Sequence, residues 1–298
     1  MWKREDRAVM KSYVRIADIT FCFFASEGLT LSDESRVYRG FGCEPTTDAD
    51  YTIEVRIADK PHVIDRSVGY LGEGENIGHT WHILQRDGAE IFTTLLESNP
   101  KYLTAQLTLN GRDGLLELYP KVPTTEVDAY LFPMLNLMMA RVLHVRNGIL
   151  VHSSVVDDGG KGYLFTAVSG TGKSTMARIW QSCGATIVND DMNVLSLTDE
   201  NIVRATNIPM PYYNAKPTQT TLKAIFLISQ SPTNFTRPVS GAVANLRFFA
   251  NTIYHALNKD VAAHHLSIVN GIAARVPMYE LGFKPDADIV DEVRRLNL

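Results

Sequence analysis

The sequence predicts an α/β (α+β) fold, in which a β-rich N-terminal half precedes a domain of alternating strands and helices. Three observations support this prediction. Residues 12–120 contain repeated short runs in which apolar and polar residues alternate. A glycine-rich loop near the middle of the chain joins an apolar run to a run with helical spacing. Beyond that loop, apolar runs and helical patterns continue to the C-terminus, which indicates helices packed on a sheet.

The first half is predicted to be an antiparallel β domain. Its strands are expected at residues 13–24, 51–57, 80–84, 90–96, 102–109 and 115–119. Tight turns at residues 86–88 and 110–114 combine Asp or Asn with Gly, which is typical of hairpins. Because this half contains no nucleotide motif, we expect it to serve substrate recognition or assembly.

Residues 120–128 contain two prolines among polar residues, a composition typical of a linker. We therefore divide the chain into a β-rich domain, residues 1–125, and a nucleotide-binding domain, residues 126–298. The second domain is expected to begin with a helix over residues 129–146, whose apolar residues share one face and which ends at an Asn-Gly pair.

A phosphate-binding loop is the most informative motif. Its glycines let backbone N–H groups curl round an anion, its lysine supplies a positive charge, and its hydroxyl can reach Mg²⁺. ATP or GTP is therefore the ligand that the motif predicts. The residues assigned to nucleotide binding are Ser169, Gly170, Thr171, Gly172, Lys173, Ser174 and Thr175.

The surroundings of the loop fit this interpretation. Residues 162–168 predict a buried strand and residues 174–183 predict a helix, so the helix N-terminus would face the phosphates. Ala167 stands where the usual pattern has its first glycine, a replacement that costs only the freedom to adopt positive φ. The alternative is a glycine-rich turn that only caps a helix. The Lys-Ser-Thr sequence after the glycines and the predicted strand and helix on either side of the loop disfavour it.

Two carboxylates follow the next predicted strand, residues 185–188. Asp190 and Asp191 come directly after it, and residues 193–197 are expected to pair with it as the return strand. Carboxylates at the end of a buried strand beside a phosphate loop can hold the Mg²⁺ of a nucleotide. Two acidic turn residues without a ligand are the alternative. An earlier strand, residues 149–156, carries His152.

The remaining C-terminal sequence continues the alternation of strands and helices. The adjacent histidines at 264 and 265 would point about 100° apart on a helix, which disfavours a shared metal. The expected elements are an ordered loop at 204–213, a strand at 222–229, helical segments at 239–257 and around 264, a strand at 278–283 and a helix at 286–296.

Composition and charge argue against several classes of protein. The chain is 45% hydrophobic and 21% charged, which is ordinary for a globular protein, and its net charge of -4 gives no general attraction to nucleic acid or membranes. Three widely spaced cysteines predict neither a disulfide framework nor a zinc site, so a reducing cytoplasm is expected. No run has the pattern of a signal peptide or a membrane span.

The order and spacing of the motifs are similar to those of the catalytic domain of bacterial HPr kinase/phosphorylase and its relatives. Residues 152–156, 169–175 and 189–191 carry the resemblance, which covers about residues 130–298. It implies a phosphoenolpyruvate carboxykinase-like domain, a mixed α/β sheet with a phosphate loop. Residues 204–213 resemble the proline-bearing loop near the substrate in these kinases.

The resemblance also implies roles for the site residues. Lys173 would bind the β- and γ-phosphates of ATP, and Ser174 and Asp190 would hold Mg²⁺. Asp191 would take the proton from a substrate hydroxyl, and His152 would orient the acidic pair. Which aspartate holds the metal and which acts as base stays open.

These observations predict an ATP- and Mg²⁺-dependent kinase that phosphorylates a hydroxyl of a protein, a peptide or a small molecule such as serine. A homo-oligomer is one possible assembly. A nucleotide-binding module without phosphoryl transfer is the second hypothesis, because no glycine- and arginine-bearing signature follows the acidic pair. A carboxykinase acting on a keto acid is the third, and it lacks the additional lysine and arginine motifs.

Overall fold

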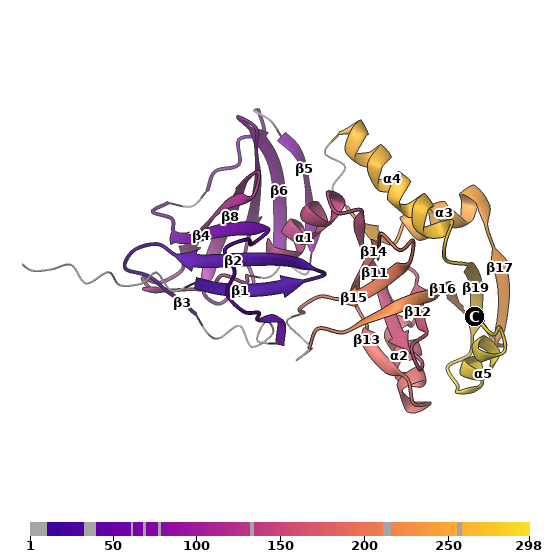
Figure 1. The fold of residues 1–298 in the computed structure, drawn as a ribbon. Helices are drawn as coiled ribbons and strands as arrows, with labels where there is room; N and C mark the ends of the chain where they lie inside the picture. Colours follow the sequence, from indigo (N-terminus) through magenta and orange to yellow (C-terminus); the bar gives the residue numbers. More distant parts are fainter. Residues whose placement is uncertain are drawn as a thin grey trace, which may run out of the picture. The chain divides into compact units, whose positions relative to one another are not determined.

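The computed structural model describes residues 11–32, 40–60, 62–67, 70–76, 79–131, 134–210, 216–254 and 258–298 (Figure 1). The chain divides into two compact units. The first comprises Met1–Met138 and Pro209–Lys216, and the second comprises Met139–Ile208 and Pro217–Leu298. Residues 126–138, which the sequence placed in the second domain, group with the first unit.

The first unit is built on an eight-stranded sheet in the order β1-β2-β4-β9-β8-β7-β6-β5. A separate two-stranded sheet pairs β3 (Thr30–Leu31) with β10 (Glu126–Val127). The strands of the large sheet are β1 (Lys11–Ile16), β2 (Ile19–Ala25), β4 (Tyr51–Ile57), β5 (Tyr70–Asn76), β6 (His79–Arg86), β7 (Ala89–Leu95), β8 (Tyr102–Asn110) and β9 (Asp113–Pro120).

Two predictions for this unit are wrong. The run at 13–24 is two strands, because Ala17 and Asp18 adopt φ values of 49° and 62° and turn the chain back as a hairpin. The sheet is also mixed, since β4 pairs in parallel with both β2 and β9. The long connection between β2 and β4 allows a parallel crossover that a two-residue turn would forbid. The turn at 86–88 is confirmed, with positive φ at Asp87 and Gly88.

The second unit contains strands β11 to β19 and helices α2 to α5. The first of its strands is β11 (Gly148–Asp157), which follows α1 (Met134–His144). The other elements are β12 (Gly162–Thr166), α2 (Lys173–Ser182), β13 (Thr186–Asn189), β14 (Met192–Leu197), β15 (Val203–Asn207), β16 (Gln219–Gln230), β17 (Phe235–Val239), α3 (Gly241–Phe249), β18 (Thr252–Ile253), α4 (Lys259–Ala273), β19 (Met278–Phe283) and α5 (Asp288–Arg294).

The sheet of this unit is also mixed, and part of it closes on itself. Its path runs β12-β11-β14-β15-β16-β19-β17, and β12 additionally pairs in parallel with β16. Strand β11 has the central place in this sheet. Along its ten residues it pairs with β12, β13, β14 and β18. The end of β11 and the ends of its partners therefore meet in one region of the unit.

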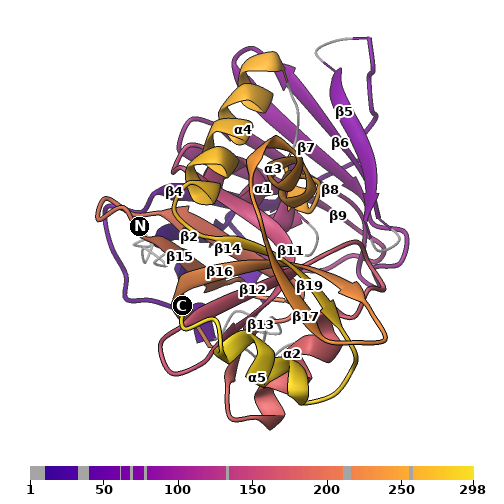
Figure 2. The same cartoon turned by 90° about the vertical axis from the view of Figure 1, so that its right-hand side faces the viewer.

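Helices cover both faces of this sheet (Figure 2). On one face α3 and α4 contribute to a core that includes Phe248 and Ile272, and on the other α2 and α5 contribute Trp180 and Val293. Strand β16 supplies both cores alternately, which explains why its sequence is a continuous apolar run. The predicted strand at 222–229 is thus confirmed and extended.

Three further expectations need correction. Residues 193–197 do not pair with β13, because β14 pairs with β11 and β15. Helix α1 begins at Met134 and not at 129, because β10 occupies residues just before it. Of the helical segment expected at 239–257, the described residues 239–254 form one helix, α3, and then β18. Of the loop expected at 204–213, residues 204–207 belong to β15 and 211–215 lie outside the described residues.

No helix in the part of the chain that the structure describes is both long enough and apolar enough to cross a lipid bilayer. The three cysteines are free thiols.

Candidate nucleotide-binding site

The glycine-rich loop joins the end of β12 to the start of α2. Gly170 and Gly172 adopt φ values of 81° and 113°, which side chains other than glycine rarely tolerate. Gly172 is the N-cap of α2, and no side chain caps the helix. The amide N–H groups of the first helical turn are thus available to an anion, and the partial positive charge of the helix N-terminus favours one.

Gly172 has a second constraint. A Cβ atom at this position would lie 2.7 Å from Cζ of Phe283, at the end of β19. Glycine is therefore required by the backbone conformation and by the close approach of the ring. Ala167, in contrast, has no positive φ, so the replacement of the usual first glycine imposes no strain there.

The side chain of Lys173 lies inside the loop. Its Nζ donates to the carbonyl oxygens of Ala167 at 2.9 Å and Val168 at 3.4 Å, and the residue is only 6% exposed. Burial lowers the pKa of Lys173, while the nearby carboxylate of Asp191 opposes that shift. A buried ammonium group that is held at the loop by two backbone carbonyls is suited to an incoming phosphate.

The two hydroxyl residues after the lysine lie in the first turn of α2. Ser174 is half-buried and Thr175 is exposed. Ser174 and Thr175 therefore lie at the N-terminal end of α2, where the free amide groups of the helix are, as the sequence analysis predicted.

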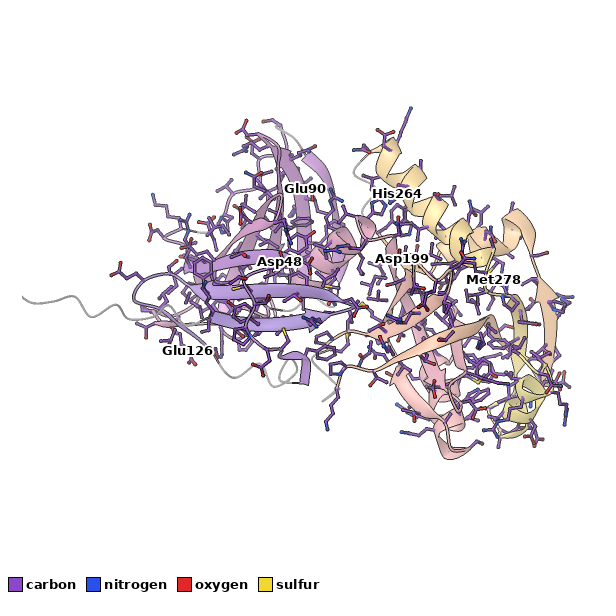
Figure 3. All side chains as sticks on the ribbon, viewed as in Figure 1. Asp48, Glu90, Glu126, Asp199, His264 and Met278 are labelled. Atoms are coloured by element: carbon purple, nitrogen blue, oxygen red, sulfur yellow. The ribbon has the colours of Figure 1, made fainter. Side chains whose placement is uncertain are left out.

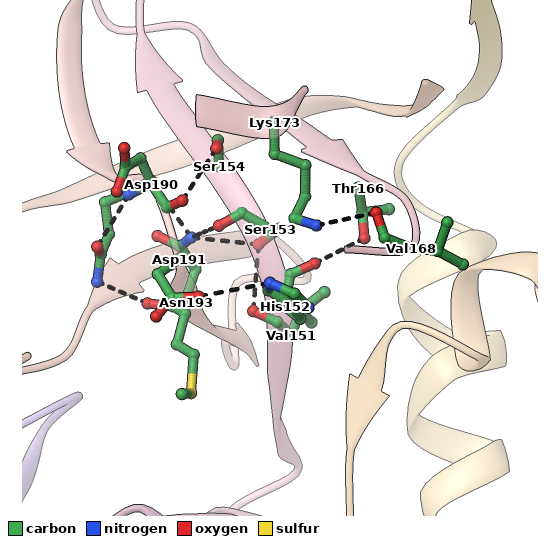
Figure 4. Close-up of polar contacts among 12 residues, drawn as sticks. Val151, His152, Ser153, Ser154, Thr166, Val168, Lys173, Asp190, Asp191 and Asn193 are labelled. Atoms are coloured by element: carbon green, nitrogen blue, oxygen red, sulfur yellow. Dashed lines mark hydrogen bonds and ion pairs between the residues drawn. The ribbon is translucent and has the colours of Figure 1, made fainter. Parts of the chain in front are cut away.

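The acidic pair occupies the tight connection between β13 and β14. The hydroxyl of Ser154 donates to the carbonyl of Asp190 at 3.2 Å, and the amide of Ser153 donates to the carbonyl of Asp191 at 2.9 Å (Figure 4). The amide of Asp190 donates to Oδ1 of Asn189. Bonds from β11 to the backbone carbonyls thus fix the position of both aspartates.

His152 and Asp191 form the closest polar pair of side chains among the predicted site residues. Nε2 of His152 lies 3.4 Å from Oδ1 of Asp191, and both side chains are partly exposed. Burial lowers the pKa of His152 and the charge of Lys173 lowers it further, so the imidazole is neutral at pH 7. Burial raises the pKa of Asp191, with His152 opposing and Asp190 reinforcing the shift.

The structure therefore brings together residues from three separate segments of the sequence. His152 from β11, Lys173 from the loop and Asp191 from the β13–β14 connection influence one another electrostatically. Asp190 lies in the same connection and is buried. These residues converge because β12 and β13 both pair with β11 and end beside it.

Asn193 is a residue of this site that the sequence analysis missed. Its Nδ2 donates to the carbonyl of Ser153 at 2.8 Å and to the Ser153 hydroxyl at 3.2 Å, which ties β14 to β11 directly behind the acidic pair. The residue is completely buried. The signal in the sequence was a polar amide side chain within an apolar strand. Such a buried group is expected to have a hydrogen-bond partner.

Two cavities border the loop. One, of about 660 Å³, is lined by the loop from Thr166 to Thr171, by β16 and by residues at the end of α3. The other, of about 500 Å³, lies at the opposite end of the loop and is lined by Gly172, Thr175 and Phe283. Together they offer space on both sides of a phosphate chain bound over the loop.

The donor set suits Mg²⁺ bound together with a nucleotide. Within the described ranges, no group of three or more His, Cys, Asp or Glu side chains could hold a metal alone. Mg²⁺ commonly binds through one or two carboxylates, waters and substrate phosphates, so Asp190 and the Ser174 hydroxyl are a sufficient protein contribution. Asp190 and Ser174 are therefore the residues that would hold a nucleotide-bound Mg²⁺.

No protein-family model matches the chain, and no curated protein is similar to it in sequence. The structure search finds a distant match, described as the structure of the Hpr(Ser) kinase/phosphatase from Coxiella burnetii. The two share 13% sequence identity with a TM-score of 0.31, over 50% of this chain and 95% of that chain. We therefore base the functional proposal on the residues and geometry of the site.

Proposed function

We propose that the chain is an ATP- and Mg²⁺-dependent kinase that transfers the γ-phosphoryl group to a hydroxyl of a protein, a peptide or a small molecule. The observation that supports it best is the convergence of Lys173, His152 and Asp191 at the loop. A phosphate loop alone would indicate nucleotide binding, whereas a carboxylate and an imidazole beside its lysine provide groups for proton transfer. The motif resemblance to HPr kinase/phosphorylase points to the same reaction.

In this proposal the chain contributes mainly position and charge. The first-turn amides of α2 and the ammonium of Lys173 bind the β- and γ-phosphates, while Ser174 and Asp190 hold the metal ion. Bound Mg²⁺ would neutralise charge on the phosphate oxygens. The acceptor oxygen forms a bond to the γ-phosphorus as the bond to the ADP oxygen breaks, and Asp191 takes the hydroxyl proton.

The pKa shifts agree with these roles. A raised pKa makes the carboxylate of Asp191 a stronger base than an ordinary aspartate. His152 is neutral at pH 7 because its pKa is lowered, so it can hydrogen-bond to Asp191 without neutralising it. We assign the base to Asp191 because it lies beside both His152 and Lys173, and we assign the metal to Asp190.

Nucleotide binding is the first test. ATP with Mg²⁺ at about 100 times its dissociation constant should stabilise the folded chain by roughly 2.7 kcal/mol in a thermal-unfolding assay. Lys173→Ala should lose this shift, whereas Lys161→Ala, an exposed lysine in the turn before β12, should retain it. Absence of a shift in the wild-type chain would overturn the proposal.

Turnover is the second test. With nucleotide binding intact, Asp191→Asn should abolish transfer of labelled phosphate from ATP to an acceptor. Unchanged transfer by this variant would contradict the assignment of the base. Tight ATP binding with no labelled acceptor in the wild type would instead support a nucleotide-binding module without phosphoryl transfer.

A further inference from the structure

The larger cavity lies next to the backbone of His152. The backbone of His152 connects both walls of this region, since its amide donates to the carbonyl of Asn251 at 2.9 Å and its carbonyl accepts from the Thr166 hydroxyl at 2.8 Å. Thr166 and Asn251 both line the cavity. Nζ of Lys173 also points to the carbonyls of the loop segment that lines it. A molecule in this cavity would therefore lie next to the backbone of His152 and to the loop segment that holds the Lys173 ammonium.

Arg247 gives the cavity a positive charge. Among the described residues that line it, Arg247 is the one charged side chain. Its guanidinium lies 3.7 Å from Glu280, and that carboxylate is already bound more closely by Arg237. Two guanidinium groups thus share one carboxylate, which leaves a net charge of about +1 at the cavity and favours an acidic ligand group.

The outer face of α3 continues from the cavity and is apolar. Val243, Leu246, Arg247 and Ala250 follow the i, i+3, i+4, i+7 spacing of one helix face, and the last two line the cavity. Val243 is 73% exposed and Leu246 is 58% exposed. Val168 of the loop, on the cavity wall, is 74% exposed. Large aliphatic side chains gathered at one cavity are the usual mark of a binding surface.

The geometry points to a peptide-binding surface, formed by the cavity and by the α3 face that carries Val243, Leu246 and Arg247. We infer that it binds a polypeptide segment in which an acidic residue and an apolar residue lie near the acceptor hydroxyl. The inference rests on the proposed function, because it names the acceptor of that same site. Arg247 would select the acidic residue, while Val168, Val243 and Leu246 would be covered by the apolar one.

The extent of the surface favours a polypeptide over a small molecule. Ala250 lies seven positions after Val243, which is about 10 Å along a helix. A small molecule enclosed by the cavity would leave the exposed side chains at the start of α3 in water. A peptide chain can fill the cavity and cover these side chains at the same time.

A peptide library provides the test. Peptides with a central serine, and with four neighbours on each side drawn from Leu, Ser, Glu and Lys, are captured on the immobilised full chain with Mg²⁺ and ADP. Mass spectrometry of the bound fraction gives the ratio of Glu to Lys and of Leu to Ser. The wild type should enrich Glu over Lys by about tenfold, and Leu over Ser by a smaller factor.

Charge reversal separates the role of Arg247 from a general loss of folding. Arg247→Glu should reverse the Glu-to-Lys ratio, which an unfolded variant could not do. Arg178→Glu is the matched control, because Arg178 is exposed on α2, does not line the cavity and takes no part in the Glu280 pairs. Val243→Ser should reduce the enrichment of Leu, whereas Val145→Ser, another exposed valine, should not.

Three results would overturn the inference. They are an absence of enrichment by a wild type that binds nucleotide, an equal effect of Arg178→Glu and Arg247→Glu, and loss of nucleotide binding in Arg247→Glu. The last would make Arg247 part of the nucleotide site. Enrichment by a wild type that shows no thermal shift with ATP would instead retain the peptide surface and remove the proposed kinase function.

Discussion

Nε2 of His152 lies 3.4 Å from Oδ1 of Asp191, although Asp191, in the connection between β13 and β14, follows His152 of β11 by almost forty positions. Both residues are anchored through the backbone. His152 pairs with Met192 across β11 and β14, and the amide of Ser153 donates to the carbonyl of Asp191. The imidazole and the carboxylate are therefore positioned by the sheet (Figure 4).

Replacement of His152 should reduce turnover without preventing ATP binding. His152→Ala removes the partner of Asp191 but leaves the amides of α2 and Lys173 in place. Removing a group that assists proton transfer typically costs about 10²- to 10⁴-fold in rate. Steady-state kinetics would measure kcat, and thermal shifts with ATP would measure binding. Equal loss in both would indicate a structural role for His152.

The pH dependence of turnover should follow Asp191. The carboxylate must be deprotonated to accept a proton, so kcat should rise with pH through its pKa, which burial places above the usual 3.8. Protonated His152 lowers this pKa, so His152→Asn should move the rise in kcat to higher pH. A profile that does not change between wild type and His152→Asn would contradict this coupling.

Gly172→Ala should destabilise the chain more than Gly170→Ala. Both glycines have positive φ, but only at Gly172 would a new Cβ meet another atom, namely Cζ of Phe283 at 2.7 Å. We expect a loss of about 1–3 kcal/mol in the free energy of unfolding at Gly172, and about 1 kcal/mol at Gly170. Urea unfolding of the two variants measures the difference. Equal losses would show that the ring moves aside freely.

Acid should destabilise the second unit through His265. This residue follows His264, which Figure 3 labels on α4. It is 1% exposed and stacks on Tyr254 with ring centroids 4.3 Å apart. Burial, together with the charges of His144 and His264, lowers its pKa to about 4, against 6.5 in an unfolded chain. The unfolded state binds the proton more readily, so this stability is complete above pH 6.5 and is lost as pH falls toward 4.

The contribution of His265 should be about 3 kcal/mol, from a shift of roughly two and a half pKa units. His265→Phe would keep the ring stacking and remove the titration. Thr252 would still donate its hydroxyl to the carbonyl of Phe249, so that group stays satisfied. The variant should therefore lose less stability than wild type between pH 7 and 5. An identical pH dependence would exclude His265 as the cause.

Local signals in the sequence were sufficient for much of the second unit. The loop, the helix after it and the strands around it were predicted because glycine positions and apolar periodicity are local properties. The approximate place of the acidic pair followed from the end of a predicted strand. The convergence of His152, Lys173 and Asp191 could not be obtained that way, because it depends on which strands pair with β11.

The wrong and missed predictions also concern features that depend on long-range pairing. The sequence shows that β4 is a strand, but its parallel pairing with β2 and β9 is a long-range choice with no local signature. The wrong partner for β14 is another such case. Asn193 was missed because its importance comes from a bond to Ser153, forty residues earlier. Positive φ at Ala17, which splits one apparent strand into two, contradicts the usual preference of alanine.

The contact between Gly172 and Phe283 has a consequence for biosynthesis. The ring that packs on the glycine belongs to β19, about a hundred residues after the loop and close to the C-terminus. Strand β19 also pairs in parallel with β16, which in turn pairs with the strand leading into the loop. While the ribosome is still translating this region, the emerging chain lacks that packing. The loop can therefore acquire its packing against Phe283 only after β19 has left the ribosomal exit tunnel.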